Sequence, residues 1–197
     1  MNGELPAENR QEYNPDLANR LIELGYLGLF QQSDEVDLKA IWNASGAPEA
    51  LESIAASSNA PMLARFLAAE ILLYQGEVFR VVKRKQELAR VYAVALADNF
   101  TEVANAWGLP GIIDGLAEEH LLTIGEPMVS ELLNLLDNEK RIYYEGSQEA
   151  TLGHHYGYRV KDLAAYYISK ITNTLLELDE DPSIRDTAIE KLKSTMI

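Results

Sequence analysis

Residues 158–171 read YRVKDLAAYYISKI, and residues 61–73 read PMLARFLAAEILL. Both stretches place apolar residues at the three- and four-residue spacing of an α-helix, and both contain the tripeptide Leu-Ala-Ala. The second stretch is apolar nearly all round, which is typical of a helix enclosed by others. Small alanines allow a neighbouring helix to approach closely. The two stretches therefore predict the inner helices of an all-α protein.

Each inner stretch follows a segment that begins at or next to a proline and ends in a polar turn. These segments read PEALESIAAS at residues 48–57 and EPMVSELLNLLDN at residues 126–138. A proline in the first turn favours the start of a helix. The sequence therefore predicts two helix pairs built on one plan.

This internal repeat resembles HEAT-like helical repeats over about half of the chain. The better match is YRVKDLAAYYISKI, which resembles the second helix of that family. Its Val, Asp and Ala-Ala positions are Val160, Asp162, Ala164 and Ala165. The resemblance implies an α-α superhelix, which is a stack of helix pairs, and it implies no activity. Because the middle of the chain fits no repeat, an irregular helical bundle is the alternative fold.

The chain has 197 residues, no cysteine and a formal net charge of −14. The absence of cysteine excludes disulfides, cysteine nucleophiles and thiolate zinc sites. The negative charge repels nucleic acid and anionic lipid headgroups, so we expect neither nucleic acid nor membrane as a partner. No stretch reads as a signal peptide or a membrane span, which makes the cytoplasm the expected location. An exported protein whose leader has been removed would give the same pattern.

We expect residues 1–13 to form a flexible arm and residues 14–197 to form one all-helical domain. The longest periodic segment runs from Glu77 to Asn99. It predicts a single helix whose apolar residues, including Val78 and Val82, face inward.

The helical pattern fails at residues 138–157, between the helices of the second pair. We expect an inserted loop or a small β-hairpin there, with a strand at residues 141–144. The insertion is rich in aromatic and histidine rings, which either form an exposed recognition surface or fold back to cap the helix stack. The candidate binding residues in this part of the chain are Tyr143, Tyr144, His154, His155, Tyr156, Tyr158, Arg159 and Asp162.

The same segment offers side chains for a metal or an acid–base site, namely His154, His155, Glu149 and Asp162. Adjacent histidines on an extended segment point to opposite faces, and no motif such as H-E-x-x-H supports them. The sequence therefore predicts no metal site and no other cofactor.

Five of the 17 basic residues lie in the first half of the predicted long helix. They are Arg80, Lys83, Arg84, Lys85 and Arg90. The cluster could bind an acidic partner or a phosphate. The interpretation that we favour is neutralisation of acidic side chains on neighbouring helices.

No nucleophile motif and no phosphate-binding loop is found in the sequence. We therefore expect a non-enzymatic module that binds a protein partner, with the aromatic insertion on its contact face. Two other functions stay open. One is a small-ligand binder or metal-dependent enzyme with a pocket near residues 143–162. The other is an acidic inhibitor or immunity-like protein that blocks a basic active site.

Overall fold

The computed structural model of this protein describes residues 13–32 and 34–196. Within these residues the fold is all-α, as the sequence predicts, and no sheet is present. The elements in chain order are α1 (Pro15–Phe30), α2 (Val36–Trp42), α3 (Ala47–Ala56), α4 (Met62–Tyr74), α5 (Val78–Val82), α6 (Lys85–Asp98), the 3₁₀ turn η1 (Ala104–Trp107), α7 (Leu116–Ile124), α8 (Pro127–Leu133), α9 (Ser147–Tyr156), α10 (Val160–Thr172) and α11 (Pro182–Met196). Residues 1–12 of the predicted arm lie outside the described residues, and Tyr13 packs half-buried against the core.

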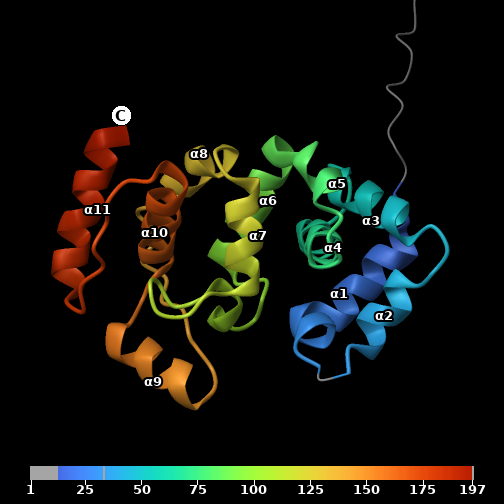
Figure 1. The fold of residues 1–197 in the computed structure, drawn as a ribbon, viewed down its shortest axis with the longest axis horizontal. Helices are drawn as coiled ribbons and strands as arrows, with labels where there is room; N and C mark the ends of the chain where they lie inside the picture. The colour runs from blue at the N-terminus through green and yellow to red at the C-terminus, as the bar shows by residue number, and fades with distance from the viewer. Residues whose placement is uncertain (1–12, 33, 197) are drawn as a thin grey trace, which may run out of the picture.

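The helices lie side by side in a row that follows the chain from one end of the molecule to the other (Figure 1). Helices α1 to α5 form one end, α6 to α8 the middle, and α10 and α11 the opposite end, while α9 lies apart at the edge below α10. Helix α4 contacts α1, α3, α5, α6 and α7, and helix α10 contacts α7, α8 and α11. Helices α4 and α10 are therefore central to the two halves of the row.

Both predicted helix pairs are present. Helix α3 packs against α4, and α8 packs against α10. The two Leu-Ala-Ala blocks, residues 67–69 and 163–165, have no solvent exposure. Pro48 and Pro127 lie in the first turns of α3 and α8, where the missing N–H of proline breaks no helical hydrogen bond. The predicted inner helices are thus confirmed.

Helix α1 begins with a cap and bends before its end. The side chain of Asn14 accepts a hydrogen bond from the N–H of Leu17 at 3.1 Å, which satisfies a donor of the first turn. The bend lies at Gly25, whose φ of 64° is readily adopted by glycine. It lets the buried ring of Tyr26 stack on Phe66 of α4.

Glu70 of α4 forms a polar cluster inside the core with Tyr92 and His120. Glu70 is fully buried, and its Oε1 accepts a hydrogen bond from the hydroxyl of Tyr92 at 2.5 Å. The same oxygen lies 2.9 Å from Nδ1 of His120. A buried carboxylate is tolerated when it has hydrogen-bond partners of this kind. Because Tyr92 belongs to α6 and His120 to α7, the cluster links three helices near the middle of the row.

The single helix predicted from Glu77 to Asn99 is wrong. The chain forms α5 and α6 instead, separated at Arg84, whose φ of −119° and ψ of 15° are not helical. Val81 is the buried residue of α5, whereas Val78 and Val82 are exposed rather than facing inward. Packing against α4 selects one buried position on α5, and such tertiary contacts decide where short helices begin and end.

The loop or hairpin predicted at residues 138–157 needs correction, because the segment contains helix α9. No strand is present at residues 141–144, where the structure has only an isolated bridge. Gly153 is the one buried residue of α9, so this helix has no apolar stripe. A Cβ atom at Gly153 would lie 2.2 Å from Cδ2 of Tyr144, and the missing side chain makes that close contact possible.

Candidate functional site

The aromatic residues predicted as a binding surface divide into a buried set and an exposed set. Tyr144 and Tyr158 are buried, and the hydroxyl of Tyr144 donates to the carbonyl of Gly108 at 3.0 Å. Tyr143, by contrast, is 69% exposed. Two of the rings therefore fold back onto the core, and Tyr143 is left at the surface.

Helix α9 carries His154, His155 and Tyr156 at the edge of the molecule (Figure 1). Both histidines are exposed, and Nε2 of His155 lies 3.1 Å from Oε2 of Glu180. Tyr156 is half-buried and stacks on Tyr158 with 5.1 Å between the ring centroids. Tyr156 thus attaches α9 to the core, while the two histidines remain a predicted contact surface.

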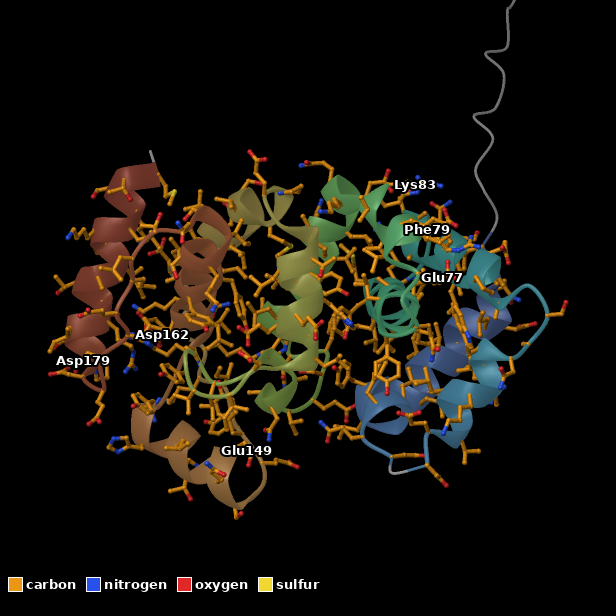
Figure 2. All side chains as sticks on the ribbon, viewed as in Figure 1. Glu77, Phe79, Lys83, Glu149, Asp162 and Asp179 are labelled. Atoms are coloured by element: carbon orange, nitrogen blue, oxygen red, sulfur yellow. The ribbon has the colours of Figure 1, made fainter. Side chains whose placement is uncertain are left out.

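Arg159 and Asp162 belong to a buried ionic network. Oδ2 of Asp162 accepts hydrogen bonds from the backbone N and from Nε of Arg159 at 2.8 and 2.9 Å. Oδ1 accepts from Nη2 of Arg159 at 2.9 Å and from Nε of Arg185 at 3.2 Å. Arg185 lies on α11, so the network joins α10 to α11 (Figure 2). Four hydrogen bonds occupy the acceptor sites of the Asp162 carboxylate, which leaves none for a metal or a substrate.

Further charges surround this network on its solvent side. Oδ1 of Asp186 accepts from Nη2 of Arg159 at 2.7 Å and lies 2.8 Å from Nζ of Lys161. The ammonium of Lys161 also bonds Glu139. The hydrogen bond from Arg159 lowers the pKa of Asp186, and the one from Lys161 lowers the pKa of Glu139. Each charged group lies next to a group of opposite charge, so the network holds these segments together.

The groups considered for a metal or acid–base site do not come together. Asp162 is enclosed by its arginines, whereas Glu149 lies on α9, well away from it (Figure 2). Among residues 13–32 and 34–196, no group of three or more His, Cys, Asp or Glu side chains is placed to hold a metal ion.

Helix α5 presents apolar side chains to solvent, and two of them, Val78 and Val82, are at positions that the sequence pattern places in the core. Phe79 is 54% exposed, and Val78 and Val82 on the same helix are exposed as well. Two cations lie near the ring of Phe79, with Cζ of Arg80 at 5.2 Å and Nζ of Lys83 at 5.6 Å from its centroid. Figure 2 labels Phe79 and Lys83. We call Val78, Phe79, Val82 and Lys83 the α5 patch. A contiguous exposed apolar group with a polar rim is characteristic of contact sites.

The two cations beside the ring differ in what they bind. Three carboxylates surround Arg80, and its Nη2, Nη1 and Nε lie 2.8, 2.7 and 2.9 Å from the nearest oxygen atoms of Glu49, Glu52 and Glu77. This is the neutralisation predicted for the basic cluster. Lys83 forms no ion pair with any residue that the structure describes. The α5 patch therefore carries a positive charge that is available to a partner.

No protein-family model matches the chain, no curated protein is significantly similar to its sequence, and no solved structure is significantly similar to its fold. Within the described ranges, no helix is long and apolar enough to cross a membrane. The side chains of the chain itself must therefore indicate what it binds.

The sequence contained one signal for the α5 patch that periodicity alone does not use. The basic run Lys83–Lys85 follows Val82 directly, and Arg80 follows Phe79. Helix positions this close to several charges are hard to bury, because each charge would need a partner inside the core. The same charges thus favour a surface position for Phe79 and Val82, although they do not distinguish these residues from the buried Val81.

A second surface feature lies at the opposite end of the row, beside the linker between α10 and α11. Two grooves of about 790 and 510 Å³ share residues 174–176 in their walls. The first is bordered by the C-terminal ends of α7 and α10, and the second by α11. Neither groove is lined by the residues 143–162 that were predicted to surround a ligand pocket.

Proposed function

We propose that this protein is a protein-interaction module that binds its partner through the α5 patch. The observation that carries the proposal is Phe79, a half-exposed aromatic ring with two cations within about 6 Å of its centroid, on a helix of only five residues. Aromatic side chains that become covered supply much of the binding energy at protein contacts. Charges at the rim of a contact select which partner binds.

The chemistry of the patch indicates the kind of partner. Val78, Phe79 and Val82 offer apolar area that a leucine or an aromatic side chain can cover. Lys83 forms no ion pair with a described residue, so a carboxylate of the partner would pair with it. We therefore propose a protein segment with apolar and acidic side chains. A nucleic acid is not proposed, because the net charge of −14 repels a polyphosphate chain.

A HEAT-like stack, which remains a proposal, is consistent with this function. Two helix pairs, α3 with α4 and α8 with α10, lie within an all-helical fold and are compatible with a helical repeat. Helical-repeat proteins present extended surfaces that bind other proteins. The absence of cysteine fits a reducing compartment, and we propose the cytoplasm as the place of action.

The test compares three forms of the full chain as bait in a lysate of the native host. The patch variant combines Phe79→Ser with Lys83→Glu. The control variant combines Val36→Ser with Lys39→Glu, a matched change at an exposed valine and an exposed lysine on α2. Proteins captured by each bait are quantified by mass spectrometry, and circular dichroism confirms that all three baits are folded.

We expect at least one protein that the wild-type and control baits retain and the patch variant loses by about tenfold or more. Retention of every captured protein by the patch variant at wild-type levels would contradict the proposal. A further bait with Tyr143→Ala and His155→Ala examines the exposed part of the surface predicted from the aromatic insertion. If only that bait lost the partner, the contact face would lie at α9 and the residues around it rather than at the α5 patch.

A further inference from the structure

The linker between α10 and α11 presents an apolar and acidic face. Residues 174–179 have no helical or strand conformation, and their exposure alternates along the chain. Leu175 is 86% exposed, more than any other large hydrophobic side chain among the described residues. Glu177 and Asp179 are exposed on the same alternation, whereas Leu176 and Leu178 pack half-buried against the core. One face of the linker therefore combines a leucine with two carboxylates.

The carboxylates of this face form no ion pair with any described residue. Glu177 forms no ion pair with a described residue, and Oδ1 of Asp179 accepts only the backbone N–H of Asp181. The next acidic side chain, Glu180, is paired with His155 instead. Glu177 and Asp179 are consequently available to a cation from outside the molecule.

The surroundings of Leu175 offer room for an aromatic ring. The two grooves share Leu175 in their walls, and exposed Ile184 adds apolar surface to the second groove. Each groove also contains one lysine, Lys170 or Lys191, and Lys170 already lies over the ring of Tyr166. Each groove also has one glutamate in its wall, Glu126 in the first and Glu177 of the linker in the second, so Glu126 and the linker carboxylates are the groups that could attract a cation.

We infer that the α5 patch of one copy of this chain binds the 174–179 linker of a second copy. Phe79 would lie against Leu175, and Lys83 would pair with Glu177 or Asp179, so both the apolar and the charged parts of the two surfaces are complementary. This inference rests on the proposed function, because it names the partner of the same α5 patch.

The contact has to form between copies rather than within one. Helix α5 packs against α4 and α6, whereas the linker joins α10 to α11 at the other end of the row (Figure 1). Phe79 and Asp179 accordingly lie at opposite sides of the molecule (Figure 2). A contact between two different surfaces leaves one of each free on the resulting pair, so further copies can add to form a chain or a closed ring.

Such a contact should be weak. The surfaces are small, which is typical of transient association. Both copies also carry a net charge of −14, so their overall repulsion opposes the local attraction at α5. We therefore expect self-association that is visible only as the protein concentration rises.

Sedimentation velocity of the full chain over a concentration series tests the inference with three variants. The patch variant is Phe79→Ser with Lys83→Glu, and the linker variant is Leu175→Ser with Glu177→Lys. A control variant, Ile112→Ser with Glu119→Lys, makes the same kinds of change at exposed positions elsewhere. We expect the wild-type and control chains to form dimers and larger species, and each of the other variants alone to stay monomeric.

The decisive sample is an equimolar mixture of the patch variant and the linker variant. Each retains the surface that the other has lost, so the mixture should form dimers that contain one of each and grow no further. Oligomers of either variant alone, or a mixture that stays monomeric, would overturn the inference. A wild-type chain that is monomeric at every concentration would also overturn it, whereas the proposed function fails only if the patch variant retains every captured protein.

Discussion

Asp162 of α10 and Arg185 of α11, both without solvent exposure, form an ion pair with 3.2 Å between Oδ1 and Nε. The same guanidinium donates to three backbone carbonyls, those of Tyr156, Asp179 and Glu180, at 3.0, 2.8 and 3.0 Å. One side chain therefore holds the end of α9, the linker and α11 against α10. The pair explains why Asp162, a predicted binding residue, serves the fold.

Removal of Arg185 should destabilise this end of the molecule. Arg185→Met leaves three part-buried carbonyls without this donor and leaves the buried Asp162 with Arg159 alone, so we expect a loss of about 3 kcal/mol in the free energy of unfolding. Guanidinium denaturation followed by circular dichroism measures it. The control is Arg20→Met, which breaks an exposed pair with Asp37 and should cost less than about 1 kcal/mol. Equal effects of the two substitutions would contradict the role of Arg185.

Glu118 should make the stability depend on pH. Burial raises its pKa from an ordinary value of 4.5 to about 7, although a hydrogen bond from the N–H of Gly115 acts in the opposite direction. Between these values the folded chain keeps a proton that the unfolded chain has released. The free energy of unfolding should therefore fall as the pH rises from about 4.5 to about 7.

Glu118→Gln should remove that fall, because an amide does not ionise and its oxygen can still accept from Gly115. At pH 8 we expect the variant to be more stable than wild type by about 2–3 kcal/mol, and at pH 4 to be nearly equal to it. Denaturation midpoints across this pH range provide the measurement. Glu119→Gln, the adjacent exposed glutamate, should leave the pH profile unchanged.

The hydroxyl of Tyr92 should matter more than that of Tyr26. Tyr92→Phe removes a donor to the buried carboxylate of Glu70, and we expect a loss of about 2 kcal/mol in unfolding free energy. The buried hydroxyl of Tyr26 interacts with the same carboxylate but has no hydrogen bond of good geometry, so Tyr26→Phe should change the stability by less than about 1 kcal/mol. Thermal and chemical denaturation of both variants measure these losses. A larger loss of stability for Tyr26→Phe than for Tyr92→Phe would contradict this description of the Glu70 cluster.

Gly115 should tolerate no side chain. A Cβ atom there would lie 2.2 Å from the backbone N of Gly108 and 2.4 Å from the carbonyl oxygen of Ala106. We expect Gly115→Ala to cost about 3 kcal/mol because backbone atoms have to move. Gly111→Ala is the matched comparison, since its φ of 72° causes strain but its Cβ would meet no neighbour within 4 Å. That variant should lose only about 1 kcal/mol by the same denaturation measurement.

Helices whose apolar residues recur at helical spacing were predictable from the sequence. Helices that bury only one residue, such as α5 and α9, were not. The Leu-Ala-Ala blocks at residues 67–69 and 163–165 are buried, and each lies in a helix whose apolar residues recur at helical spacing. Helix α9 was missed because its burial depends on Gly153, a residue that adds nothing to a hydrophobic pattern. The long helix at 77–99 was overextended because periodicity cannot show that Arg84 leaves the helical conformation.

The candidate surface was harder to predict than the fold. The sequence predicts that acidic side chains neutralise the basic cluster, and Arg80 is neutralised in this way. The exposure of Val78 and Val82 was not predicted, because the apolar period of this segment is the same whether α4 or solvent covers these side chains. For the same reason Tyr143 and Tyr144, adjacent in the chain, could not be assigned to the surface and to the core in advance.

Local order along the chain was enough to specify an all-helical protein with two proline-started helix pairs, since periodicity, capping and composition act over a few residues. Whether a charged or aromatic side chain stabilises the fold or lies at the surface depends on how distant segments pack together. Asp162 became structural because Arg185, on another helix, lies against it. Phe79 and Leu175 are exposed because no segment among the described residues packs over them, and that arrangement is decided by the tertiary structure.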